Sequence, residues 1–237
     1  MNDSELRKDF SNPPPICHGR PLWFWNGPLS KERTKTVLEG CKRAGYGGVG
    51  IMPAQGMSPA FMTPQFIEQY KFAVETAAGL GLKLCLYDEY WFPSGWAGGL
   101  LQKKYPDALS KRLDMVAQDV SGPKSVEMAV PAGQLMSAVA MNKATKERMD
   151  LRGQLRDGKL SWSVPAGDWK VMLFVCVRDG ARGLVDYLDP DAVKRFAELT
   201  YEAYFSFLGP HFGTTIDSAF YDEPTMHWIE GGRAWTP

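Results

Sequence analysis

The chain alternates short apolar stretches with amphipathic ones, and this alternation limits the possible folds more than any other feature of the sequence. Residues 21–27 and 47–53 predict buried strands, while 31–44 and 63–77 carry apolar residues at helical spacing. A third apolar stretch, 83–90, follows the second predicted helix directly. Strand–helix–strand–helix–strand with short links predicts right-handed crossovers and a parallel sheet covered by helices.

Residues that begin and end helices support these boundaries. Ser30 is placed to cap the first predicted helix, and Gly45 follows its last turn. Thr63 and Pro64 stand where the second helix would begin, because proline is favoured in a first helical turn. Two strand–helix units are therefore expected before the strand that begins near Lys83.

The pattern changes between residues 111 and 183. Residues 134–141 and 170–175 alternate apolar with other side chains, as half-buried strands do. Asp157-Gly158 and the segment 165–168 carry turn residues. We interpret this region as an inserted antiparallel β-rich subdomain.

The α/β pattern resumes after the insertion. A helix beginning at Asp189-Pro190 is expected to extend to Tyr204, and residues 216–221 predict a fourth strand that ends in Asp222-Glu223. The predicted fold class is α/β, a partial (β/α)₈ TIM barrel made of the first four strand–helix units with a β-rich insertion. The expected domains are residues 1–110 for the first half-barrel segment, 111–183 for the insertion and 184–237 for the barrel continuation.

Four strand–helix units make half of an eight-stranded barrel, which leaves sheet edges and apolar faces uncovered. We therefore expect the chain to be an amino-terminal fragment that is inactive alone. The alternative is completion by self-association or by a partner that supplies the missing half.

Polar and aromatic side chains follow the predicted strands where a parallel barrel keeps its reactive groups. Carboxylates hydrogen-bond sugar hydroxyls, and aromatic faces stack on pyranose rings, so the mixture predicts a carbohydrate pocket. The residues expected to bind substrate are Trp25, Asn26, Asp88, Trp91, Asp222 and His227.

Two carboxyl groups are needed to cleave a glycosidic bond, one protonated and one ionised. Glu223 and Glu89 are the candidate catalytic residues, and each follows another acid, which can raise the pKa of one partner. The competing interpretation is that such a glutamate caps the next helix or pairs with an arginine. Two acidic pairs at two strand ends favour the site.

Composition excludes several other classes of function. The formal net charge is zero without a basic run, so neither nucleic acid nor an anionic membrane is an expected partner. The first ten residues are polar where a secretory signal would be apolar, and no segment reaches membrane-spanning length. The four cysteines lie far apart, without metal or disulfide spacing. A cytoplasmic protein is expected.

Four sequence blocks carry a likeness to a known family: residues 21–27 (PLWFWNG), 43–49 (RAGYGGV), 86–99 (LYDEYWFPSGWAGG) and 220–224 (FYDEP). Together they resemble bacterial glycoside hydrolases related to the family 106 α-L-rhamnosidases. The resemblance implies a (β/α)₈ catalytic barrel with accessory β domains, activity on plant or bacterial glycans, and Glu223 at the position of the general acid.

The resemblance also implies that Asp88 and Glu89 hold the sugar or assist catalysis. The later strands that would supply the second catalytic carboxylate are absent from these residues. Family 106 enzymes use calcium, but no ligand cluster in this sequence assigns it. We therefore assign no cofactor, and calcium is left as the one ion that the resemblance implies.

Two other functions stay open. A non-catalytic carbohydrate-binding protein would use the same aromatic and acidic side chains without a second carboxylate. A barrel enzyme such as an aldolase or isomerase would require a lysine or a set of metal ligands at the strand ends, and neither is present there.

Overall fold

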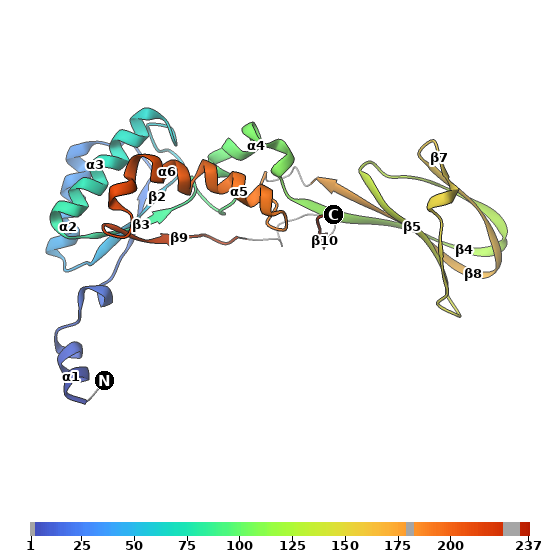
Figure 1. The fold of residues 1–237 in the computed structure, drawn as a ribbon, viewed down its shortest axis with the longest axis horizontal. Helices are drawn as coiled ribbons and strands as arrows, with labels where there is room; N and C mark the ends of the chain where they lie inside the picture. Colours follow the sequence, from blue (N-terminus) through green and yellow to red (C-terminus); the bar gives the residue numbers. More distant parts are fainter. Residues whose placement is uncertain (1–2, 179–182, 225–232) are drawn as a thin grey trace. The chain divides into compact units, whose positions relative to one another are not determined.

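Helices and strands alternate along the first hundred residues, as the apolar pattern predicts (Figure 1). The computed structural model describes residues 3–178, 183–224 and 233–237. The chain divides into an α/β unit, Met1–Lys104 with Lys194–Pro224, and a β-rich unit that includes Tyr105–Val193. The elements of the α/β unit are α1 (Asp3–Ser11), β1 (Leu22–Trp25), α2 (Lys31–Arg43), β2 (Gly48–Pro53), α3 (Pro64–Leu80), β3 (Lys83–Tyr87), α4 (Leu100–Lys104), α6 (Tyr201–Leu208) and β9 (Ile216–Phe220); α5 (Pro190–Leu199) crosses the division.

The four strands of the α/β unit form one parallel sheet in the order β1-β2-β3-β9. Because the strands are parallel, their carboxyl ends share one edge of the sheet. Tyr87, the last residue of β3, pairs with Phe220, the last residue of β9. This register places residues that are far apart in the sequence, Asp88 and Tyr221, directly beyond neighbouring strand ends.

Helices α2, α3 and α6 pack on one face of the parallel sheet (Figure 1). Their apolar side chains and those of the strands share one core, which also contains the indole of Trp25. Side chains alternate between the two faces of a strand, so Leu22 and Phe24 lie on the opposite face, where they are 43% and 44% exposed. The two faces of the sheet are therefore covered unequally.

The predicted helix starts are confirmed at both α2 and α3. Ser30 accepts a hydrogen bond from the Arg33 amide at 3.2 Å, and Thr63 accepts one from the Phe66 amide at 3.3 Å. At the other end of α3, Gly81 adopts a left-handed conformation with φ 65°, which glycine tolerates best. These local signals fix where both helices begin and where α3 ends.

Gly48 is required by the close approach of β2 to β3. A Cβ atom at this position would lie 2.2 Å from the backbone oxygen of Lys83. Gly48→Ala is therefore expected to lower the free energy of unfolding by about 3 kcal/mol, because the two strands would have to separate. Urea unfolding measures this change.

Gly79→Ala is the matched control, since a Cβ atom there would meet nothing within 4 Å. This substitution should be neutral or slightly stabilising. Equal effects of the two substitutions would contradict the packing argument.

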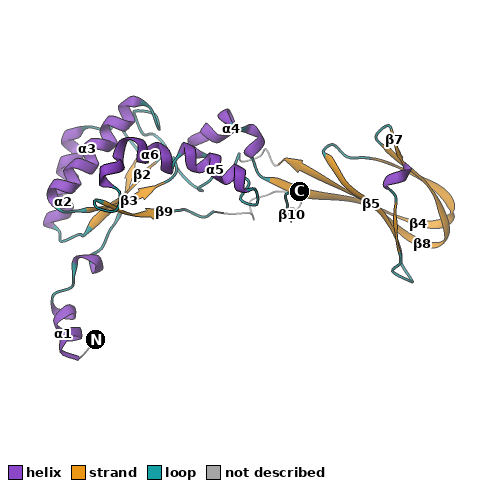
Figure 2. Cartoon of the chain, viewed as in Figure 1, coloured by secondary structure: helices purple, strands orange, loops and turns teal. Residues whose placement is uncertain are grey.

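The β-rich unit contains the antiparallel sheet predicted for the insertion (Figure 2). Long strands β4 and β8 pair along most of their length, and β5 pairs with the other edge of β8. The apolar faces of these strands form a second core around Ala138, Leu160 and Val171. The strands are β4 (Lys111–Ala129), β5 (Gln134–Asn142), β6 (Arg148–Asp150), β7 (Leu155–Arg156), β8 (Lys159–Arg178) and β10 (Arg233–Ala234).

Three sequence predictions need correction. The expected helix to Tyr204 is two helices, α5 and α6, which are separated at Thr200. Residues 165–168 do not form a turn: they continue β8 opposite Gly122, and both strands bend there through a register shift. The end of the chain differs from the expected continuation of the α/β pattern, because Arg233 and Ala234 pair with β4 in the β-rich sheet. The turn at Asp157-Gly158 is confirmed between β7 and β8.

No helix within residues 3–178, 183–224 and 233–237 is long and apolar enough to cross a membrane.

Candidate functional site

Two acidic pairs lie at the same edge of the parallel sheet. Asp88 and Glu89 follow β3, and Asp222 and Glu223 follow β9 after one intervening residue. Since β3 and β9 are hydrogen-bonded neighbours, the structure brings these pairs together as the sequence pattern predicts. The four acids have very different environments, however, and these environments separate their roles.

Glu89 is fully buried inside the loop that follows β3. Its Oε1 accepts hydrogen bonds from the amides of Tyr90 and Gly98, and its Oε2 accepts from three more amides. The Oε2 donors are Gly95 at 3.1 Å, Trp96 at 2.9 Å and Ala97 at 2.7 Å. The carboxylate therefore organises the loop 90–98, and its oxygens are not accessible to a substrate.

Burial raises the pKa of Glu89, and the backbone N–H donors oppose that rise. Each oxygen faces at least two donors, so a proton on either oxygen would meet an N–H group rather than an acceptor. The ionised carboxylate is the form that fits the loop. The structure thus gives Glu89 a structural position in place of the catalytic one expected from its place after a strand.

Asp88 is also fully buried, and both of its oxygens are occupied. Ser94 Oγ donates to Oδ1 at 2.6 Å, and the hydroxyl of Tyr201 on α6 donates to Oδ2 at 2.9 Å. Asp88 was expected to bind substrate, but its oxygens are directed at these two protein hydroxyls instead. Sequence patterns did not single out Ser94 or Tyr201, because only the fold brings them to Asp88.

Burial raises the pKa of Asp88 to about 6, against the lowering effect of its bonds with Ser94 and Tyr201. An unfolded aspartate titrates near 3.9, so between about pH 4 and pH 6 the folded state holds a proton that the unfolded state has released. The free energy of unfolding should therefore fall as the pH rises through this window, and then become independent of this group above it.

Asp88→Asn removes this titration while keeping the size of the side chain. Relative to the variant, the wild type is expected to lose about 2 kcal/mol of stability between pH 4 and pH 6.5. Urea unfolding at several pH values measures the difference. Parallel stability curves for the two proteins would show that Asp88 does not titrate in this range.

The second acidic pair is more accessible. Asp222 is partly buried and Glu223 is exposed. Burial raises the pKa of Asp222, and the neighbouring charge of Glu223 raises it further. Glu223 has φ 42°, a left-handed conformation that is uncommon for a residue with a side chain. Backbone strain of this kind often occurs at functional sites, so this pair is the stronger candidate for chemistry.

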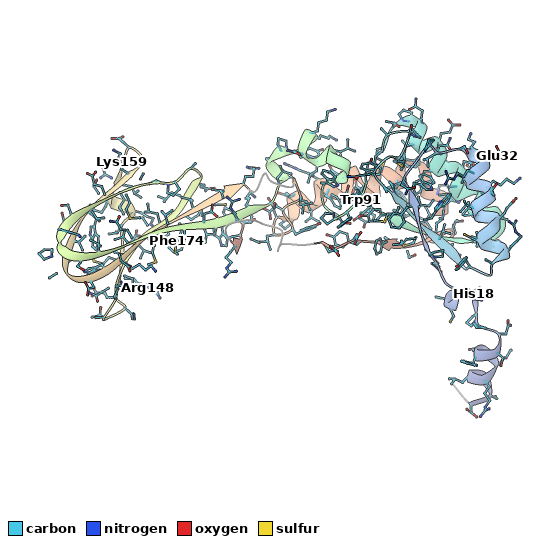
Figure 3. All side chains as sticks on the ribbon, turned by 180° about the vertical axis from the view of Figure 1, so that it is seen from behind. His18, Glu32, Trp91, Arg148, Lys159 and Phe174 are labelled. Carbon is cyan, nitrogen blue, oxygen red and sulfur yellow. The ribbon has the colours of Figure 1, made fainter. Side chains whose placement is uncertain are left out.

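An aromatic cluster lies beside these strand ends. Trp91, labelled in Figure 3, has φ 66°, and its backbone is fixed by two strands: its amide donates to Pro53 and its carbonyl accepts from Tyr87. The ring of Trp91 lies 6.5 Å from that of Phe24 and 5.5 Å from that of Phe92. Phe24 and Phe92, which the sequence pattern did not single out, are 44% and 38% exposed. The cluster therefore offers aromatic surface for stacking.

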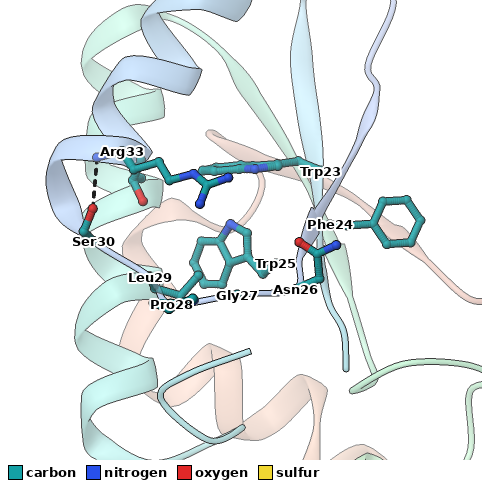
Figure 4. Close-up of a pocket in the computed structure, with 10 residues that line it drawn as sticks. Trp23, Phe24, Trp25, Asn26, Gly27, Pro28, Leu29, Ser30 and Arg33 are labelled. Atoms are coloured by element: carbon teal, nitrogen blue, oxygen red, sulfur yellow. Dashed lines mark hydrogen bonds between the residues drawn. The ribbon is translucent and has the colours of Figure 1, made fainter. Parts of the chain in front are cut away.

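Trp25 and Asn26 lie in different environments although they are adjacent. The indole of Trp25 is only 1% exposed and packs against Phe66 and Tyr70 of α3, so it offers no face to a sugar. Asn26 is exposed and lines a hollow between the end of β1 and the first turn of α2 (Figure 4). The lining residues all come from 23–30, 33 and 34, so this hollow does not include the acidic pairs.

His227 lies outside the described residues, so its expected role stays a prediction. Within the described part of the chain, no group of three or more histidine, cysteine, aspartate or glutamate side chains could hold a metal ion.

The geometry defines a mixed α/β protein with acids and aromatics at the carboxyl edge of a parallel sheet. No family model matches the chain, and no curated protein matches it. Among solved structures, the fold is similar to that of a rhamnosidase from Novosphingobium sp. PP1Y, with a TM-score of 0.68 and 16% sequence identity. The similarity covers 98% of this chain and 40% of the rhamnosidase chain, and it shows a fold related to that enzyme.

Proposed function

We propose that this protein is a glycoside hydrolase that acts on O-glycosidic bonds of plant or bacterial glycans, with α-L-rhamnosides as the first substrates to test. The observation that carries the proposal is the accessible pair Asp222–Glu223, which follows β9 at the same edge of the parallel sheet as the aromatic cluster of Trp91, Phe24 and Phe92. Acids that bind or protonate and rings that stack are the groups a sugar site requires.

The sheet is proposed to be part of a (β/α)₈ barrel. Helices α2, α3 and α6 pack on one face, whereas a doubly wound sheet would carry helices on both. The opposite face presents apolar Leu22 and Phe24, as the interior of a barrel would. The rhamnosidase-like fold supports this proposal, and further strands would supply the second catalytic carboxyl group.

Glu223 is the proposed proton donor to the leaving oxygen. Its side chain is exposed at the end of β9, where it can reach a substrate, and its left-handed backbone is the kind of strain that functional sites often carry. Glu223 would protonate the glycosidic oxygen as the bond between that oxygen and the anomeric carbon breaks. A second carboxylate or an activated water would attack the anomeric carbon and form the new bond.

A second candidate function, non-catalytic carbohydrate binding, is favoured by one specific observation. Asp88 and Glu89 are both 0% exposed, so of the four strand-end acids only Asp222 and Glu223 are accessible. Binding needs only these groups and the aromatic cluster, whereas hydrolysis needs another carboxyl group.

The experiment that separates the two functions measures binding and turnover on the same protein. Aryl glycosides, including an α-L-rhamnoside, are tested for release of the aryl group, and the corresponding free sugars are titrated by NMR. Turnover supports the hydrolase. Binding without turnover by the 237-residue chain, followed by turnover once further barrel strands are added, supports the half-barrel proposal. Binding without turnover in both cases supports the binding protein, and no binding contradicts both.

A further inference from the structure

Ser94 connects the loop after β3 to the segment after β9. Its hydroxyl donates to Asp88 and accepts from the Asp222 amide at 3.0 Å, and its own amide donates to the Asp222 carbonyl at 2.8 Å. The side chain is fully buried. One serine therefore fixes both backbone polar groups of the residue that precedes Glu223.

Asp88 fixes Ser94 in turn. The 2.6 Å hydrogen bond orients the Ser94 hydroxyl, so that its lone pairs face the Asp222 amide. The Tyr201 hydroxyl holds the other oxygen of Asp88 from α6. Buried hydrogen bonds of this kind are strong because water does not compete with them.

The segment that carries Glu223 needs such support. It lies beyond the last ladder pair of β9, which is Tyr87 with Phe220. Its left-handed φ of 42° is costly for a glutamate and persists only where surrounding contacts hold it. The two bonds from Ser94 hold the backbone immediately before that strained residue.

We propose that Ser94 and Asp88 are positioning residues, which set the place of the Asp222–Glu223 pair without touching the substrate. This inference rests on the proposed function for the identity of the reaction. Its structural part, the control of the Asp222 backbone by Ser94, stands on the hydrogen bonds themselves.

The test combines amide hydrogen exchange with kinetics. In Ser94→Ala, exchange of the Asp222 amide should rise at least tenfold. In the smallest version of the protein that hydrolyses an aryl glycoside, kcat should fall at least tenfold while KM stays within twofold. Ser206→Ala is the control, because that exposed hydroxyl donates to the Ala203 carbonyl within its own helix. It should change neither quantity.

Tyr201→Phe keeps the inference testable if the serine variant unfolds, because it removes one hydroxyl and leaves the ring in place. Exchange of the Asp222 amide should rise at least threefold, with a smaller loss of kcat, while Tyr46→Phe at an exposed tyrosine should change neither. Unchanged exchange, or raised exchange with unchanged kcat, in folded variants would overturn the inference. If no version of the protein turns over a glycoside, including one extended by further barrel strands, the proposed function fails, and exchange alone decides whether Ser94 and Asp88 position the pair.

Discussion

Glu89→Gln is expected to lower the free energy of unfolding by about 3 to 5 kcal/mol. The substitution keeps the shape of the side chain but replaces one oxygen with an NH₂ group. Whichever way the amide turns, that group faces at least two of the five backbone N–H donors that surround the carboxylate. The N–H groups of the glutamine amide would then face backbone N–H groups, and no water could hydrogen-bond either of them in this buried site.

Urea unfolding at pH 7 measures this loss. Glu75→Gln is a matched control on the exposed surface of α3, and its effect should stay within about 0.5 kcal/mol. Amide exchange should also rise at the five residues whose amides donate to the carboxylate, which are Tyr90, Gly95, Trp96, Ala97 and Gly98. A variant as stable as the wild type would show that Glu89 is protonated in the folded protein, since glutamine imitates the protonated acid.

Glu223→Gln is expected to lower kcat on an aryl glycoside by about 10² to 10⁴, the usual contribution of a general acid. KM should change little, because glutamine can still hydrogen-bond a sugar hydroxyl. The loss should be smaller for an aryl group that leaves easily, since such a group needs less protonation. These effects are measured as kcat and KM, in the smallest version of the protein that hydrolyses an aryl glycoside.

Glu202→Gln, at an exposed position of α6, is the matched control and should keep the wild-type rate. Unfolding of the Glu223 variant should match that of the wild type, because the replaced side chain is exposed. A rate within threefold of the wild type would exclude Glu223 as the proton donor. The same loss in Asp222→Asn, with none in Glu223→Gln, would assign the proton to Asp222.

The sequence by itself determined the four strands of the α/β unit and two of its helices. The apolar periodicity and the caps at Ser30 and Thr63 predicted α2 and α3, because helix starts are decided by groups within one turn. Alternation likewise predicted β5 and residues 170–175 of β8. The order of strands and helices also predicted that the acids would lie at one edge of the sheet, because the carboxyl ends of parallel strands share one edge.

Only the tertiary structure decided which acids are accessible. Glu89 and Glu223 each come second in an acidic pair that follows a strand, yet one is enclosed by backbone amides and the other is exposed. The difference arises because the loop after β3 folds back on its own carboxylates: its amides enclose Glu89, and its Ser94 hydrogen-bonds Asp88. Tyr201 reaches Asp88 from a distant part of the sequence. Burial and long-range hydrogen bonds depend on where the whole chain passes, and no local pattern encodes them.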